Sequence, residues 1–150
     1  CLAIGYLFGL FQTSYIYGKA HGIDIRNYGS GNAGTTNTLR TLGKPAGYIV
    51  FLGDALKAVF AVWIVRYLLF PGLGDVTKIL ETVTALGVVL GHNYPFYMNF
   101  KGGKGIAATG GFMFALDVRR SSGLCPVPLI TCFANWGYYY SSPRSGHPPV

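Results

Sequence analysis

The sequence predicts an all-α fold, that of a polytopic helical membrane protein with about four transmembrane helices. Charged residues make up only 11% of the 150 residues, whereas a soluble domain usually has about 25%. Hydrophobic residues make up 51%, and they gather in four apolar segments of helical length. So few charges would not cover the surface of a soluble domain of this length, and a membrane protein is therefore expected.

The first apolar segment, residues 1–17, carries no charge. It is long enough for most of a membrane span, since a full span needs about 20 residues. The chain starts without Met, and no charged region precedes the apolar residues. We therefore expect a fragment that begins inside a membrane segment rather than a signal peptide.

The second apolar segment, residues 46–70, contains Asp54 and Lys57. Residues three apart share a face of a helix. Ionised side chains inside a membrane usually pair and face the interior of the bundle. The spacing therefore predicts a structural ion pair, with a catalytic role for the pair as the alternative.

The third and fourth segments are residues 79–100, with a polar break around His92, and the small-residue segment 106–116. The connections 18–45 and 101–105 carry more Lys and Arg than the connection 71–78. The positive-inside rule then predicts that both basic, Gly-rich connections are cytoplasmic and that the N-terminus is outside.

The last 33 residues differ in composition from the rest, with clustered Pro and a run of three Tyr. We therefore expect a membrane-embedded domain over residues 1–117 and a tail over residues 118–150 that is frameshifted or disordered. The net charge is +7, but the basic residues form no stripe, so nucleic acid is not an expected partner. Three Cys without zinc-type spacing predict neither a metal site nor a disulfide framework.

The first motif is GSGNAGTTNTLR, residues 29–40. Its Gly-x-Gly-x-x-Gly spacing is formally a dinucleotide fingerprint, but the short, polar IDIRNY before it is not a buried strand, and we reject that interpretation. Thr35 or Thr36 can cap a short helix, whose free amides suit an anion. Neutral donors and a fixed cation would complete the site: Ser30, Asn32, Asn37 and Arg40. The alternative is a Gly-rich turn with a helix cap.

The second motif is GHNYPFYMNFKGGKG, residues 91–105. It is not a Walker A loop, because Gly and not Ser or Thr follows Lys104. Gly102, Gly103 and Gly105 around Lys104 nevertheless suit a nest of backbone amides that holds a phosphate. The alternative is a basic turn at the membrane interface, in which Lys101 and Lys104 contact lipid phosphates.

His92 is the one histidine inside either motif. Near neutral pH an imidazole can serve as a base or as a hydrogen-bond donor, although a lone histidine is also often structural. The sequence contains neither the GxSxG of a serine hydrolase nor an acyltransferase His-x4-Asp.

The two motifs, in the forms GSGNAGTTNTLRTLGKPAG followed by GDALK and then GHNYPFYMNFKGGKGIAAT, resemble the bacterial membrane acyl-phosphate:glycerol-3-phosphate acyltransferase family. The resemblance covers roughly residues 1–117 and includes FGLFQTSYIYGK near the start. A third, His-Arg-x-Asn-Ile type motif has no counterpart, so we expect a partial copy. The resemblance implies a multi-pass enzyme of the inner membrane with cytoplasmic active-site loops.

Such an enzyme transfers an acyl group from acyl phosphate to the 1-hydroxyl of glycerol 3-phosphate. The product is 1-acylglycerol 3-phosphate (lysophosphatidic acid), an intermediate of phospholipid biosynthesis. The implied partners are these two substrates and membrane lipids, with no cofactor and no metal. Acyl phosphate is already activated, so we expect direct transfer, with a substrate phosphate or His92 taking the proton.

Resemblance and spacing together give two sets of candidate site residues. The catalytic candidates are Ser30, Arg40, His92 and Lys104. The substrate-binding candidates are Gly31, Asn32, Thr36, Asn37, Lys101, Gly102, Gly103 and Gly105. Two rival functions use the same loops: a transporter or channel fragment that recognises phosphate, and a membrane structural protein whose loops contact only lipid headgroups.

Overall fold

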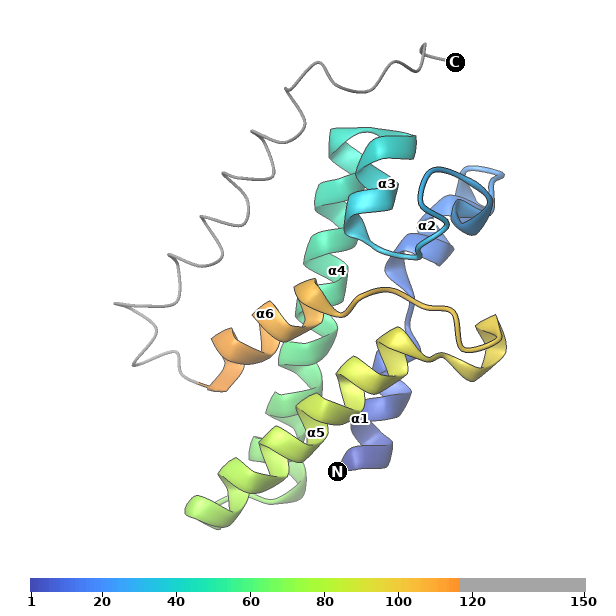
Figure 1. The fold of residues 1–150 in the computed structure, drawn as a ribbon. Coiled ribbons are helices and arrows are strands. Elements are labelled where there is room, and N and C mark those ends of the chain that lie inside the picture. Colours follow the sequence, from blue (N-terminus) through green and yellow to red (C-terminus); the bar gives the residue numbers. More distant parts are fainter. Residues whose placement is uncertain (117–150) are drawn as a thin grey trace. The chain divides into compact units, whose positions relative to one another are not determined.

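The computed structural model describes residues 1–116, and every regular element in this part of the chain is helical (Figure 1). The all-α prediction is therefore confirmed. The elements in chain order are α1 (Leu2–Gly9), α2 (Thr13–Ala20), η1 (Ile25–Asn27), α3 (Thr35–Leu42), α4 (Lys44–Trp63), η2 (Ile64–Leu69), α5 (Asp75–Asn93), η3 (Phe96–Met98) and α6 (Ile106–Leu116). The predicted tail lies outside the described residues, and the chain divides into units at residue 116.

The central element is α4, which packs against α1, α2, α3, α5 and α6 (Figure 1). It begins at Lys44, directly after α3, and the φ of 87° at Gly43 lets the chain turn between the two helices. The π-helix η2 continues it, and together they form residues Lys44–Leu69. Within residues 1–116, this is the one helix that is long and apolar enough by itself to cross a membrane.

Small side chains allow α1 and α5 to pack backbone against backbone. Gly5 and Gly9 of α1 face Gly87 and Gly91 of α5, so each helix presents two glycines four residues apart. A Cβ added at Gly5 would strike the carbonyl of Thr84, and the other three positions would strike backbone in the same way. This is the small-xxx-small contact of membrane helices, and the glycine content serves helix packing as well as loops.

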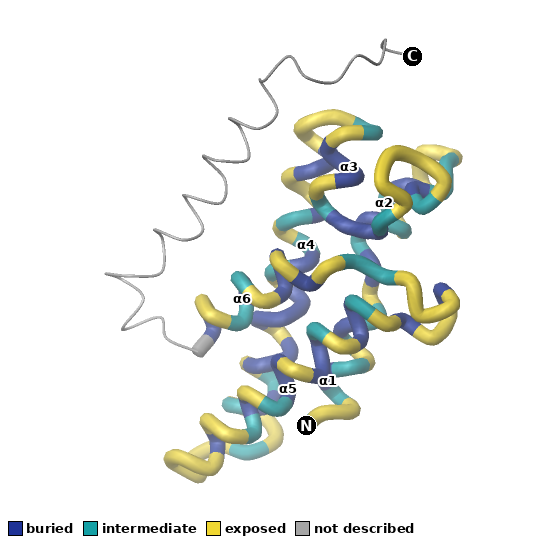
Figure 2. Tube along the Cα trace, in the orientation of Figure 1, coloured by how far each residue is buried: buried dark blue, intermediate teal, exposed yellow. Residues whose placement is uncertain are grey.

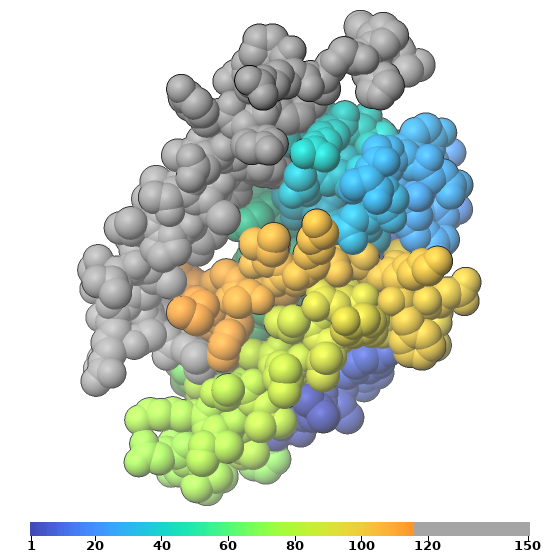
Figure 3. Space-filling view, in the orientation of Figure 1, coloured from blue at the N-terminus to red at the C-terminus, as the bar shows by residue number. Residues whose placement is uncertain are grey.

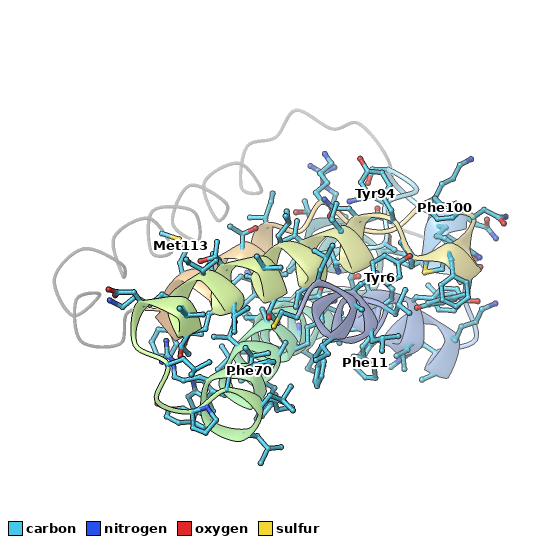
Figure 4. All side chains as sticks on the ribbon, turned by 90° about the horizontal axis from the view of Figure 1, so that it is seen from below. Tyr6, Phe11, Phe70, Tyr94, Phe100 and Met113 are labelled. Atoms are coloured by element: carbon cyan, nitrogen blue, oxygen red, sulfur yellow. The ribbon has the colours of Figure 1, made fainter. Side chains whose placement is uncertain are left out.

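The expected first span, residues 1–17, is divided into α1 and α2 around Leu10–Gln12. Gln12 is fully buried, and its side-chain Nε2 donates to the carbonyl of His92 at 2.8 Å. The hydroxyl of Tyr6 donates to the carbonyl of Tyr94 at 2.8 Å, and the two residues lie near each other in Figure 4. The break between α1 and α2 therefore allows the first apolar segment to contact the C-terminal end of α5.

The core lies where α4, α5 and α6 meet (Figure 2). Two clusters of mainly small apolar side chains fill it: Ala58, Ala61, Val88 and Ala108 in one, and Val59, Val62, Ala85 and Ala115 in the other. At the other end of α5 from His92, Arg66 donates to both carboxylate oxygens of Glu81, at 2.6 and 2.7 Å. Glu81 is buried, so this ion pair links η2 to α5.

Candidate functional site

The two motifs meet at Gly103. A Cβ at this position would strike Nε2 of His92, and it would lie 2.7 Å from the carbonyl oxygen of Ala33. A Cβ at Gly34 would lie 3.9 Å from the Cα of Gly103. Figure 3 shows the second loop and the start of α6 directly against the segment around α3. The structure therefore joins the two loops, although they are some 70 residues apart in the chain.

An apolar cluster packs the two loops together at this junction. Ile25 and Ala33 of the first loop are fully buried against Met98 of η3, which precedes the second loop. Tyr15, Ile23 and Leu42 cover the cluster. The loops are thus held by hydrophobic burial as well as by hydrogen bonds.

Asn37 holds the first loop in shape. It is buried in α3, and its Nδ2 donates to the carbonyls of Ile25 at 3.0 Å and of Tyr28 at 2.9 Å. Its Oδ1 accepts from the amide of Ser30 at 2.9 Å. The structure therefore places Asn37 as a residue that positions Ser30, while its predicted contact with substrate stays a prediction.

A surface ion pair supports the same loop. Arg26 donates to Asp24 through Nε at 3.0 Å and through Nη2 at 2.8 Å. The guanidinium of Arg26 also lies over the ring of Tyr15, 5.0 Å from its centroid. The side-chain hydrogen bond from Arg26 lowers the pKa of Asp24 to about 2. The carboxylate therefore stays charged well below neutral pH.

The predicted helix in the first motif is present, but its cap differs from the prediction. α3 begins at Thr35, and its N-cap is Gly34, with no side-chain hydrogen bond to the cap. Thr35 and Thr36 lie inside the first turn, where the backbone amides have no carbonyl partner within the helix. These amides and the positive end of the helix dipole lie next to Gly103 and suit an anion.

The predicted amide nest in the second loop is wrong for two of its members. The amide of Gly102 donates to the carbonyl of Asn93, and that of Gly103 donates to the carbonyl of His92, each at 3.0 Å. Both amides cap the C-terminal end of α5 and are already used. Gly105 adopts a φ of 72°, which favours glycine. The side chains of Lys101 and Lys104 are exposed in this loop.

The two motifs carry three exposed cations. Arg40, Lys101 and Lys104 have exposed side chains, and the described residues provide no ion pair for any of them. Ser30 and Gly31 are exposed in the first loop, as is Thr36, while Asn32 is half-buried. These candidates can therefore reach a ligand from solvent.

His92 is buried at the end of α5 and belongs to a polar cluster inside the bundle. The Nζ of Lys57 lies 2.8 Å from Nδ1 of His92 and 2.9 Å from Oδ1 of Asp54. It also donates to the carbonyl of Phe11 at 2.7 Å, and Thr13 donates to the same Asp54 oxygen at 3.0 Å. The predicted Asp54–Lys57 ion pair is confirmed, and His92 is an unforeseen third member.

Sequence reasoning missed Lys57 as a neighbour of His92, because 35 residues separate them. Within residues 1–116, no group of three or more His, Cys, Asp or Glu side chains could hold a metal ion. An apolar pocket of about 540 Å³ lies between α1 and α4 and reaches Lys57. Its other lining residues are Leu7, Phe8, Phe11, Gly53, Leu56 and Phe60.

Fold and site together define a polytopic helical membrane protein with a cationic, Gly-rich site at one end of its bundle. The family model described as glycerol-3-phosphate acyltransferase matches residues 1–143. The chain belongs to the glycerol-3-phosphate acyltransferase family.

Relatives of known name agree with this assignment. A Clostridioides difficile protein named glycerol-3-phosphate acyltransferase is 45% identical over 132 residues, which are 87% of this chain and 60% of that protein. A Moorella thermoacetica protein named glycerol-3-phosphate acyltransferase 2 is 40% identical over 136 residues, 90% of this chain and 62% of that protein. The chain thus spans about three-fifths of the length of these relatives.

Two crystal structures of PlsY (YgiH), described as an integral membrane glycerol 3-phosphate acyltransferase, have the same fold. The glycerol 3-phosphate form is 40% identical, with a TM-score of 0.66, and the match covers 77% of this chain and 56% of that one. The lysophosphatidic acid form is 38% identical, with a TM-score of 0.64, and the match covers 77% and 55%.

Proposed function

We propose that this chain is part of an acyltransferase that moves an acyl group from acyl phosphate to the 1-hydroxyl of glycerol 3-phosphate. The observation that carries the proposal is the meeting of the two loops at Gly103, with the first turn of α3 beside it. Both substrates carry a phosphate; the junction offers helix amides, and the two motifs that form it carry three exposed cations. The names of the relatives support glycerol 3-phosphate as the acceptor.

The reaction we propose is a direct transfer. The hydroxyl oxygen of glycerol 3-phosphate attacks the acyl carbonyl carbon, and the bond from that carbon to the phosphate oxygen breaks. Inorganic phosphate leaves and takes the hydroxyl proton, and the product is 1-acylglycerol 3-phosphate. Arg40 suits two-point contact with a substrate phosphate, and Lys101 and Lys104 suit point contacts with the phosphates held at the same junction. Holding both phosphates in place would supply much of the rate enhancement.

We also propose that the apolar pocket between α1 and α4 takes the acyl chain. Its lining is apolar apart from Lys57, which contacts His92 and so connects the pocket to the loop junction. The positive-inside rule supports an inner-membrane protein whose two basic loops are cytoplasmic. An acyl phosphate made in the cytoplasm would then meet the site directly.

The test is an assay of the chain in phospholipid vesicles with acyl phosphate and glycerol 3-phosphate. We expect release of inorganic phosphate only when both substrates are present, with one lysophosphatidic acid formed per phosphate. At glycerol 3-phosphate concentrations below KM, Arg40→Ala should strongly reduce this release, and the matched cation variant Lys78→Ala, at the other end of α5, should not. Phosphate flux across the vesicle without consumption of acyl phosphate would instead indicate a transporter.

A further inference from the structure

We propose that Lys57 is a positioning residue that holds His92 in its Nε2-protonated form, so that the ring presents a hydrogen-bond donor to the loop junction. The inference about the ring stands on the geometry of the buried cluster. Its consequence for catalysis rests on the proposed function.

The environment of Lys57 is the first step. An ammonium group has three N–H donors and no acceptor. Three acceptors surround Nζ: the carbonyl of Phe11 at 2.7 Å, Nδ1 of His92 at 2.8 Å and Oδ1 of Asp54 at 2.9 Å. Each donor therefore has one partner, and Nδ1 must accept.

The charge on Lys57 is the second step. Asp54 is buried, and a buried carboxylate needs a compensating cation. Oδ1 of Asp54 lies 2.9 Å from Lys57 but 3.7 Å from Nδ1 of His92, so the lysine is the nearer candidate. The threonine hydroxyl of Thr13 donates to the same oxygen and holds the carboxylate towards Lys57. The cation is therefore Lys57, and the imidazole is neutral with its hydrogen on Nε2.

The direction of the ring is the third step. Nε2 lies against Gly103, where a side chain would collide with it, and the carbonyl oxygen of Ala33 borders the same position. The described residues provide no hydrogen-bond partner for Nε2. An N–H at this point suits a phosphate oxygen or the oxyanion that develops during acyl transfer.

Two consequences follow. Nε2 already carries a proton, so His92 acts as a donor and the hydroxyl proton goes to the departing phosphate. The break between α1 and α2 also contributes to this cluster, because it leaves the carbonyl of Phe11 able to accept from Lys57 and places Thr13 beside Asp54. Three chain segments thus converge to fix one ring.

The test is ¹⁵N NMR of the chain with labelled histidine, at neutral pH and without substrate. The chain has three histidines, and the His92→Gln variant assigns the signals of His92 by their loss. We expect protonated Nε2 and unprotonated Nδ1 in the unaltered protein. Protonation of Nδ1, alone or together with Nε2, would overturn the proposal.

Two matched variants separate position from packing. Asp54→Asn keeps the donor to Nδ1 and should keep the Nε2-protonated ring. The double variant Asp54→Asn/Lys57→Met removes both charges and the donor. We then expect two neutral forms of the ring in comparable amounts, one with its hydrogen on Nδ1 and the other with its hydrogen on Nε2. An unchanged ring in a folded double variant would contradict the inference. If that variant does not fold, Asp54→Asn/Lys57→Gln restores an uncharged donor and should restore the Nε2-protonated ring, and failure to do so counts equally against the inference.

Turnover distinguishes this inference from the proposed function. Relative to Asp54→Asn, the double variant should lower kcat by about 10-fold or more with little change in KM, because displacement of a catalytic group costs up to about 100-fold. An unaltered chain that has the expected ring but neither binds nor turns over substrate contradicts the proposed function alone. An active chain with Nδ1 protonated contradicts the role of Lys57 alone.

Discussion

The backbone amide of Gly103 donates to the carbonyl of His92 at 3.0 Å, and the imidazole of His92 lies against the same glycine. Gly103 therefore caps the C-terminal end of α5 and also lies where the two loops meet. Because the carbonyl of Ala33 borders Gly103 on another side, the site depends on the absence of a side chain there.

Gly103→Ala should lower kcat/KM by about 100-fold or more, because its Cβ would push apart His92 and the first loop. Gly72→Ala is the control: its φ of 79° makes an alanine there strained, but nothing lies within 4 Å of its Cβ and the turn is at the far end of α5, so only the stability and not the site should change. Steady-state assays of both variants check this. Activity of Gly103→Ala equal to that of Gly72→Ala would contradict the described junction.

Asn37→Asp should destabilise the first loop. The variant keeps the acceptor for the Ser30 amide but loses both donors to the carbonyls of Ile25 and Tyr28. Each carbonyl keeps a backbone donor, the amide of Tyr28 or of Gly31, so the loss is that of two hydrogen bonds, about 1–3 kcal/mol of unfolding free energy. Denaturant unfolding and proteolysis between residues 25 and 31 measure the effect. An unchanged rate of cleavage in this loop would show that Asn37 does not hold it.

The Asp24–Arg26 pair predicts a pH dependence outside the membrane. The pKa of Asp24 is lowered to about 2 in the folded chain, so its stabilising contribution is complete above the ordinary value of 3.8 and is lost as the pH falls towards 2. ¹³C NMR of the Asp24 carboxyl group should show a midpoint near 2. In Arg26→Gln the midpoint should return towards 3.8, and an unchanged midpoint there would rule out Arg26 as the cause.

Arg66→Met should be costly because it leaves the buried carboxylate of Glu81 without a partner. Breaking a buried ion pair in this way costs about 3–5 kcal/mol, whereas replacing both members by apolar residues is often nearly neutral. Arg66→Met/Glu81→Met should therefore be more stable than Arg66→Met, as thermal unfolding will show. Turnover of the double variant should be normal, since the pair is far from His92 along α5. Equal stability of the single and double variants would exclude this account.

Arg40 should matter through geometry as well as charge. Arg40→Ala should raise KM for glycerol 3-phosphate by about 10- to 100-fold, the worth of a charge-assisted hydrogen bond. Arg40→Lys should recover only part of this, because lysine cannot make the two-point contact with phosphate. Full recovery in Arg40→Lys would mean that Arg40 supplies only charge.

Much of the architecture could be predicted from the sequence, because few charges and long apolar segments leave little choice but membrane helices. The ion pair Asp54–Lys57 followed from its spacing on one helix. The break between α1 and α2 could not be predicted, because it depends on buried contacts of Gln12 with α5, 79 and 80 residues away.

The candidate site was predictable in its composition and less so in its geometry. The exposed cations follow from the motifs, whereas the amides of Gly102 and Gly103 are used by the end of α5, which spacing alone does not reveal. The contact of Lys57 with His92 joins two helices and has no local signal in the sequence. Glycines 5, 9, 87 and 91 carry a helix-packing spacing that could have been recognised.

The most direct test of the account is hydrogen–deuterium exchange of the chain in vesicles during titration with glycerol 3-phosphate. If the two loops form one phosphate site, residues 29–36 and 101–105 should both become protected, with the same midpoint concentration. Protection of one loop alone, or two clearly different midpoints, would contradict a single site built from both motifs.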